Sequence, residues 1–99
     1  MRIRYSRRAT RDLTSIHVYL TDHSTAGAAN VMTAIFAAIE FVRRNPLAAE
    51  VTTIRDVRAK TVQRYRFKVF YRVITEDDVV EIVHVRHTSR RPWTGEDDH

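Results

Sequence analysis

Basic side chains concentrate between positions 55 and 72, and they are the first candidates for chemistry in this sequence. One acid, Asp56, accompanies seven cations there: Arg55, Arg58, Lys60, Arg64, Arg66, Lys68 and Arg72. Cations gathered on one face of a sheet could hold a phosphate backbone or stabilise a phosphoryl transition state. The alternative is a solvated face, since charged residues commonly line the exposed side of antiparallel sheets. We favour a functional role, because an ordinary solvated face mixes charges of both signs.

The stretch from His84 to Trp93 is the second candidate. His87 ends a predicted strand and could act as a general acid or base, because the unperturbed pKa of histidine is close to neutral. Arg90 and Arg91 would lie nearby, and Trp93 could stack on a base or fill a gap. The alternative is that both histidines only satisfy local hydrogen bonds and that the tryptophan closes the edge of the core. We prefer this alternative for Trp93 and leave both open for His87.

Familiar catalytic and metal-binding motifs are absent from the sequence. It has no glycine-rich phosphate loop, no nucleophile elbow and no HExxH motif. The lack of cysteine excludes disulfides and thiolate metal sites, and His17 and His23 are too isolated to indicate a metal. We therefore expect neither a metal site nor a cofactor.

Length and charge limit the class of protein. At 99 residues the chain should form one domain, small enough for a stabilising partner to matter. The net charge is +5, and every cation except Lys60 and Lys68 is arginine, which suits bidentate contacts with phosphate or carboxylate. Nucleic acid or an acidic protein is therefore the expected partner. The simpler alternatives are solubility or a genome biased toward arginine codons.

The hydropathy pattern of the chain bears on its location in the cell. No apolar run approaches the roughly 20 residues that span a bilayer. The N-terminus is charged, but no apolar region follows it, so we expect no signal peptide. These features predict a cytoplasmic protein with no membrane partner.

Residues 65–73 organise the predicted fold. Apolar and mostly basic side chains alternate there, which indicates a central strand with one face on the core and the other presenting cations. The hydrophobic periodicity predicts further strands and two helices. The strands are expected at 2–5, 57–62 and 79–87. The helices are expected at 7–22 and, after a cap at Ser24 or Thr25, up to residue 44.

The predicted architecture is an α+β fold of order β-α-α-β-β-β. A helical hairpin should cover one face of a mainly antiparallel sheet, and the other face would be open and basic. The domain should span residues 1–93, followed by an acidic, frayed tail at 94–99. The connector at 47–54 has a mixed pattern and receives no assignment.

The second predicted helix has a broad apolar band. Met32, Phe36 and Phe41 widen the band past one helical face. It could receive an amphipathic helix of a partner, or the helix could simply be buried from two sides. The core stripe of this helix is expected to be Ala28, Val31, Ile35, Ala38, Ile39 and Val42.

In this order, the segments resemble the RelE/ParE superfamily of toxins from bacterial type II toxin–antitoxin modules. The resemblance covers residues 2–93. It rests on the opening 3–13, the helical hairpin that ends at Asn45 and Pro46, the strand at 65–73 and the ending 85–93. In that ending a histidine at the end of a strand is followed by small residues, an arginine and a tryptophan.

The resemblance implies a toxin that a cognate antitoxin neutralises in a hetero-oligomeric complex. The C-terminal segment of the antitoxin, often acidic in this family, would wrap over the helical hairpin and the sheet. We expect it to contact Met32, Phe36, Arg66 and Arg72.

The superfamily divides by mechanism, and the ending from His87 to Trp93 is more similar to the ParE-like members. The resemblance to these members implies inhibition of DNA gyrase by a protein that is not a nuclease. The target-binding residues would then be Arg58, Lys60, Arg66, Lys68, Arg72, Arg86, His87, Arg90, Arg91 and Trp93.

RelE-like members instead cleave mRNA in the ribosomal A site, which is the alternative. The catalytic residues would then be Arg66, His87 and Arg90. The RelE-like pattern places an arginine three residues before a tyrosine, where this chain has Lys68 before Tyr71, and a lysine lacks the bidentate fork of arginine. A second alternative is a non-toxic basic module that binds RNA or protein.

Overall fold

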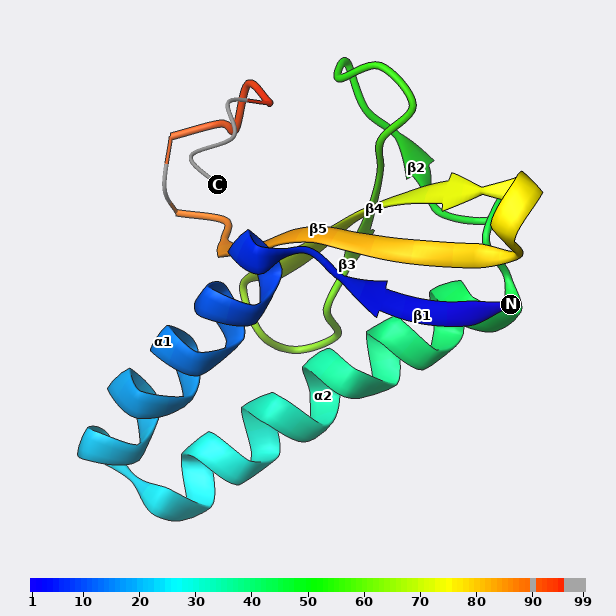
Figure 1. The fold of residues 1–99 in the computed structure, drawn as a ribbon. Helices are drawn as coiled ribbons and strands as arrows, with labels where there is room; N and C mark the ends of the chain where they lie inside the picture. Colours follow the sequence, from blue (N-terminus) through cyan, green and yellow to red (C-terminus); the bar gives the residue numbers. More distant parts are fainter. Residues whose placement is uncertain (90, 96–99) are drawn as a thin grey trace.

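A five-stranded sheet with two long helices on one face makes up the structure, a computed structural model that describes residues 1–89 and 91–95 (Figure 1). This arrangement confirms the predicted α+β fold. Among the described residues, the one strand that was not predicted is a two-residue strand in the connector that had no assignment. In chain order the elements are β1 (Arg2–Tyr5), α1 (Arg7–His23), α2 (Thr25–Arg44), β2 (Glu50–Val51), β3 (Arg58–Thr61), β4 (Phe67–Ile74), a 3₁₀ turn (Thr75–Asp77) and β5 (Val79–His87).

The strands lie in the order β1-β5-β4-β3-β2. β4 is therefore the middle strand, as the alternation of its side chains predicted, but it begins at Phe67 and not at Tyr65, so Tyr65 and Arg66 lie in the connection before it. β1 pairs in parallel with β5, and every other pair is antiparallel. A parallel pair needs a long crossover connection, and the helical hairpin is part of that connection. The acidic residues 96–98, expected in a frayed tail, lie outside the described residues.

Serine side chains begin both helices, and a single residue separates the two. The Ser6 hydroxyl accepts a hydrogen bond from the backbone N–H of Ala9 at 3.0 Å and caps α1. The Ser24 hydroxyl does the same for the N–H of Gly27 at 3.0 Å and caps α2, while its own N–H closes the last turn of α1 on Leu20. The predicted helix limits are therefore correct to within one residue.

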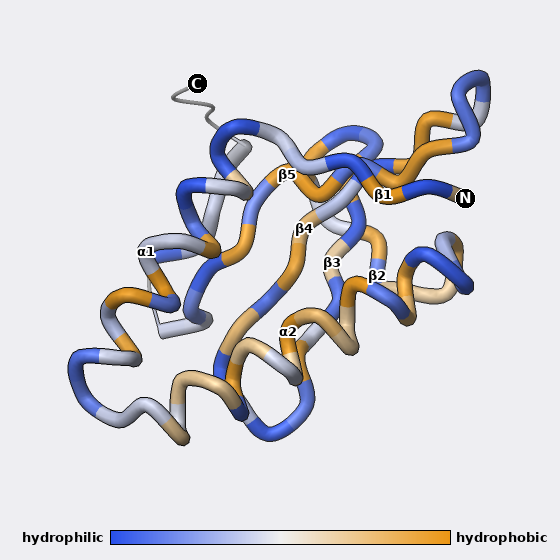
Figure 2. Tube along the Cα trace, turned by 60° about the horizontal axis from the view of Figure 1, so that its bottom comes forward, coloured by the Kyte–Doolittle hydropathy of each residue, from blue (hydrophilic) through white to orange (hydrophobic). Residues whose placement is uncertain are grey.

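The main core lies between α2 and the helix-facing side of the sheet. All six residues of the predicted α2 stripe are buried. Tyr71 is fully buried beside them, and burial raises the pKa of its hydroxyl, which donates to the Pro46 carbonyl oxygen at 2.7 Å. Although its sequence includes charged residues, α2 is long and apolar enough to span a membrane by length and composition alone. Its apolar stripe packs on the sheet instead, so α2 is the core helix of the fold (Figure 2).

The sheet face away from the helices differs from the prediction of an open, basic surface. Phe70 interrupts the cations of β4 and packs with Val57, Ala59 and Val83 in a second buried cluster. The C-terminal segment lies on the side of the sheet away from the helices (Figure 1). Trp93 packs against the cluster. The middle of the face is therefore apolar and covered, and basic side chains remain only toward its ends.

Two arginines in the last turn of α2 hold one carboxylate. Glu40 accepts from Arg43 at 2.8 and 2.6 Å and from Arg44 at 3.0 Å. Hydrogen bonding by Arg43, followed by the charges of both arginines and the bond from Arg44, lowers the pKa of Glu40 to about 2. The same pair raises the pKa of Arg43.

We expect Glu40→Gln to lower Tm near neutral pH by roughly a few degrees at most, because the ion pairs are exposed. The folded-state pKa lies below the ordinary value of 4.5, so the carboxylate stabilises the fold above that pH. This contribution is lost as the pH falls through about 2, where the variant and the parent should melt together. Thermal melts across this range test the prediction, with Glu50→Gln as the control. A difference in Tm that does not depend on pH would contradict it.

Candidate functional site

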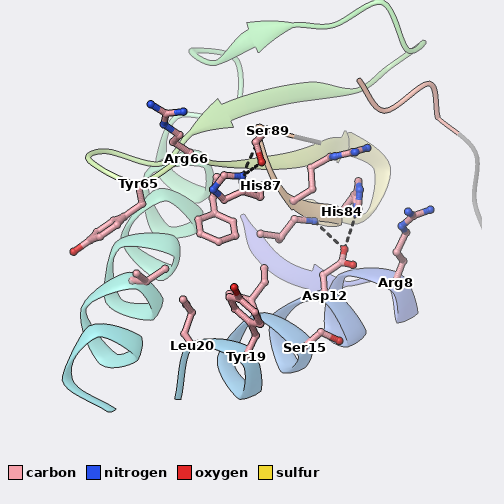
Figure 3. Close-up of a pocket in the computed structure, with 15 residues that line it drawn as sticks. Arg8, Asp12, Ser15, Tyr19, Leu20, Tyr65, Arg66, His84, His87 and Ser89 are labelled. Atoms are coloured by element: carbon pink, nitrogen blue, oxygen red, sulfur yellow. Dashed lines mark hydrogen bonds and ion pairs between the residues drawn. The ribbon is translucent and has the colours of Figure 1, made fainter. Parts of the chain in front are cut away.

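A groove of about 830 Å³ lies between the two helices and the end of β5 (Figure 3). Its walls combine apolar side chains with two tyrosines, and cations and histidines lie around them. This mixture suits a ligand that has both apolar and acidic groups. The residues that define the groove are Ile16, Tyr19, Leu20, Val31, Tyr65, Phe67, His87 and Ser89, with Arg8, Arg66 and Arg86 among the remaining lining residues.

His87 is fixed in the groove by its neighbours. Its ring meets the ring of Phe67 edge-on, with the ring centroids 5.2 Å apart. Its Nδ1 accepts the backbone N–H of Ser89 at 3.1 Å, and the Ser89 hydroxyl oxygen lies 2.6 Å from the same nitrogen. A backbone N–H can only donate, so in the neutral ring the proton resides on Nε2. His87 is thereby prepared to donate a hydrogen bond through Nε2.

His84 has a structural environment. It is 4% exposed, and its Nδ1 lies 2.6 Å from Oδ2 of Asp12, which also accepts the backbone N–H of Val85 at 3.0 Å. The Asp12 carboxylate thus connects α1 to β5 at residues 84 and 85, past the last β1–β5 pair, Tyr5 with Ile82. Sequence reasoning missed Asp12, although an acid beside the apolar stripe of a helix, between Ala9 and Ile16, signals a buried partner.

The prediction that several of the seven cations gather on one sheet face is wrong for Arg58 and Lys60. Arg55 and Arg64 lie in connections outside the strands. The antiparallel register sets Arg58 opposite Tyr71 and Lys60 opposite Val69, on the side that faces the helices. Arg58 donates from Nη1 to the carbonyl oxygens of Leu47 at 3.2 Å and Ala49 at 2.9 Å. The Lys60 ammonium nitrogen lies 4.4 Å from the ring centroid of Phe41. Both cations hold the connector and α2 instead of joining the cations of β4.

The remaining cations of β4 lie toward opposite ends of the other face. Lys68 is directly opposite Arg86, whereas Arg72 is opposite Glu81, with 4.0 Å between the charged groups. Glu81 also binds Arg4 at 3.3 Å, so this end has an acid between its arginines. Glu81 is the one acid within β4 and β5, and it lies at the Arg72 end of this face.

Three of the predicted target-binding residues, Arg90, Arg91 and Trp93, lie near the C-terminal end of the chain. Arg90 lies outside the described residues, and Arg91 is exposed. The Trp93 ring packs against Phe70 and His84, with centroid distances of 4.9 and 4.8 Å, and the Arg8 guanidinium lies 5.9 Å from its centroid. Trp93 therefore closes the edge of the second buried cluster, which is the interpretation that we preferred.

Exposed apolar side chains occur on both helices of the hairpin, and we refer to them together as the exposed strip. Met32 is partly buried against the core, whereas Phe36 is 46% exposed on α2. Val18 and Tyr19 are exposed on α1. The fold buries the predicted core stripe of α2 but leaves part of its broad apolar band open to solvent.

The sequence matches a family model over most of its length. The model is described as the ParE toxin of the type II toxin–antitoxin system parDE, and it covers residues 3–92. No curated protein matches the sequence significantly.

Solved structures share the fold. A chain of the chromosomal ParDE toxin–antitoxin system from P. aeruginosa has a TM-score of 0.74 and 21% identity, covering 88% of this chain and 95% of that one. The isolated RelE toxin of E. coli has a TM-score of 0.64 and 15% identity, covering 91% and 86%. A chain of the intact E. coli RelBE toxin–antitoxin complex has a TM-score of 0.63 and 15% identity, covering 90% and 98%.

The two kinds of comparison agree with the resemblance found in the sequence. The structural likeness establishes the RelE/ParE fold, and the family model distinguishes the subgroup. The chain belongs to the ParE toxin family of type II toxin–antitoxin systems.

Proposed function

We propose that this toxin inhibits DNA gyrase, arrests growth, and is neutralised by a cognate antitoxin in the cytoplasm. The observation that carries the proposal is the separation of the cations onto two faces of the sheet, in a chain of the ParE family. A protein that acts by binding another protein needs a shaped surface. It does not need cations assembled around one scissile bond.

Cleavage of RNA would make stricter demands on the same residues. It requires an acid, a base and cations positioned around one phosphate. Arg58 and Lys60 are engaged with the connector and α2, away from the groove. The neutral His87 ring has its Nδ1 lone pair directed at Ser89, so its other nitrogen carries the proton and cannot serve as a base. These contacts favour inhibition of gyrase over hydrolysis.

The groove and the exposed strip of the helical hairpin support an antitoxin partner. An amphipathic segment could place apolar side chains against Tyr19 and Phe36, while its acidic groups approach Arg66. The solved RelBE structure, described as an intact toxin–antitoxin complex, provides the analogy for such a hetero-oligomer. We therefore place the predicted antitoxin contacts Met32, Phe36, Arg66 and Arg72 within this proposal.

A supercoiling assay with purified toxin, freed of its antitoxin, tests the main proposal. We expect a concentration-dependent loss of gyrase supercoiling, with cleaved DNA accumulating, and recovery when the antitoxin is added. His87→Ala should raise the toxin concentration needed for inhibition without abolishing inhibition at saturation, because in this proposal His87 contacts the target and has no catalytic role. Lack of inhibition by folded toxin would overturn the assignment to gyrase.

One observation favours the ribonuclease alternative: Arg66 and His87 line the same groove. Cleavage of ribosome-bound mRNA by the wild-type protein, lost in His87→Ala, would establish that activity. Expression in cells separates the classes further, since gyrase poisoning should induce the SOS response and mRNA cleavage should not. A protein whose expression leaves growth unchanged would instead be a non-toxic binding module.

A further inference from the structure

Ser89 and His87 form a side-chain pair whose chemistry the proposed function does not use. The Ser89 hydroxyl oxygen lies 2.6 Å from Nδ1 of His87, and the Ser89 backbone N–H reaches the same nitrogen at 3.1 Å. Since Nδ1 carries no proton in the neutral ring, the hydroxyl donates to it as well. Figure 3 shows the two side chains with this contact drawn between them. The serine proton is therefore directed at the basic nitrogen of the histidine.

This geometry is typical of an activated nucleophile. A hydroxyl attacks an electrophile readily when a base within about 2.6–3.2 Å removes its proton as the new bond forms. The ring of Phe67 meets the His87 ring edge-on, with 5.2 Å between the centroids, and supports its orientation. Ser89 is exposed, so an electrophile can reach its oxygen from solvent. The pair therefore has the geometry and the access of a serine nucleophile with its base.

The surroundings of the pair distinguish the class of electrophile. Acyl transfer uses N–H donors to stabilise an oxyanion, but the backbone N–H of Ser89 already donates to His87. A phosphoryl group places its charge on several oxygens, which an arginine side chain stabilises. Arg66 lines the same groove, and its carbonyl oxygen accepts the N–H of Thr88, the residue before Ser89, at 2.7 Å. Arg66 is exposed and forms no ion pair within the described part of the chain, so the site suits a phosphoryl group.

We propose that Ser89 is a nucleophile that accepts a phosphoryl group from a small activated phosphate or phosphonate, with His87 as its general base. In the transfer, the bond between Oγ and phosphorus forms while the bond from phosphorus to the leaving group breaks. The Ser89 proton passes to Nδ1 of His87, and the leaving group departs with the bonding electron pair. Arg66 stabilises the charge on the phosphoryl oxygens. The inference goes beyond the proposed action on gyrase and does not depend on it.

Covalent labelling with an alkyl fluorophosphonate tests the inference directly. The purified toxin, freed of its antitoxin, should gain one label with loss of fluoride, and peptide mass spectrometry should place the label on Ser89. Ser15 is the internal control, because it is exposed and lines the same groove. Among the described residues, the serine bonded to a histidine is Ser89 and not Ser15. Failure to label the folded wild-type protein, or equal labelling of the two serines, would overturn the inference.

Two substitutions of His87 separate a base from a group that only positions the serine. His87→Ala and His87→Gln should both slow labelling about 100-fold, since the glutamine amide accepts a hydrogen bond but is not a base. His17→Ala is the matched control and should label at the wild-type rate, because His17 is exposed on α1 and does not line the groove. Circular dichroism confirms that each variant is folded. A wild-type rate in His87→Gln would overturn the role of His87 as a base, and the inference with it.

Arg66→Gln tests the choice of a phosphoryl group. It should slow labelling roughly tenfold, because charge develops on the phosphoryl oxygens as the bond forms. Arg64→Gln removes the same charge from an exposed arginine of the same connection that does not line the groove, and it should label as the wild type does. Equal rates in these two variants would overturn the role of Arg66. A larger acceleration, relative to a serine peptide, with 4-nitrophenyl acetate than with the fluorophosphonate would overturn the phosphoryl assignment in favour of acyl transfer.

Discussion

Replacing Asp12 with alanine is expected to lower the free energy of unfolding by about 2–4 kcal/mol. One carboxylate oxygen accepts two hydrogen bonds, from His84 and from the backbone N–H of Val85. Alanine would leave both donors without an acceptor, and the ring of His84 is almost fully buried. The other ring nitrogen, Nε2, already has no hydrogen-bond partner within the described part of the chain. Urea unfolding, followed by the fluorescence of the single tryptophan, measures the change.

Two further variants make the test specific. Asp12→Asn keeps an acceptor oxygen and should retain part of the stability that alanine loses. Asp22→Ala removes an exposed acid from the same helix and should change the free energy of unfolding by no more than about 0.5 kcal/mol. If Asp12→Ala and Asp22→Ala were equally stable, the carboxylate would not be the link between α1 and β5.

Phe36→Ala is expected to weaken binding of the cognate antitoxin roughly 30-fold, the effect of losing one aromatic hot spot. The side chain is 46% exposed in the free toxin, so it makes few contacts that the substitution would remove from the fold. Its main loss should come in the complex, where a partner would cover the ring. Calorimetric titration of the toxin with antitoxin provides the dissociation constant, and thermal melts check that the fold is retained.

Phe41→Ala is the matched control for this prediction. Phe41 is also an exposed aromatic of α2, at 39%, but its ring lies beneath the ammonium group of Lys60. We expect its loss to change antitoxin affinity less than about threefold, because it lies outside the predicted contacts. Equal losses from the two substitutions would show that the antitoxin does not distinguish the Phe36 strip from the rest of the helix.

Periodicity within single elements was predicted well. The apolar spacing of α2 identified every residue of its buried stripe, because a helix brings positions three and four apart onto one face. Alternation in β4 likewise separated Val69 from Lys68, since successive side chains of a strand point to opposite faces. These patterns need only local geometry.

Relations between elements could not be obtained in this way. Whether Arg58 shares a face with Lys68 depends on the register of β3 against β4, and a shift of one residue reverses the answer. A bulge between Phe70 and Tyr71 changes the register again. Phe70 pairs with His84 of β5, whereas Tyr71 pairs with Ile82. The contact of Asp12 with His84 joins residues 72 positions apart, beyond any local pattern.

The candidate site shows the same division. The pattern of the ending placed His87 at the end of a strand, and β5 does end there. The contact of His87 with Ser89, which fixes the ring, arises in the turn that follows and has no periodic signal. The tyrosines of the groove were not predicted as a group, because they come from α1 and from the β3–β4 connection.

Ser24 is the only residue between α1 and α2, so the helical hairpin bends at a single joint with no longer loop. This one residue has an extended backbone, ends α1 and caps α2. Tyr19 and Leu20 lie on α1 before this joint and Val31 lies on α2 after it, and all three line the groove. The width of the groove is therefore set by the backbone dihedral angles near a single joint. Inserting residues at this joint would uncouple the two walls, so the hairpin tolerates changes of side chain there better than changes of length.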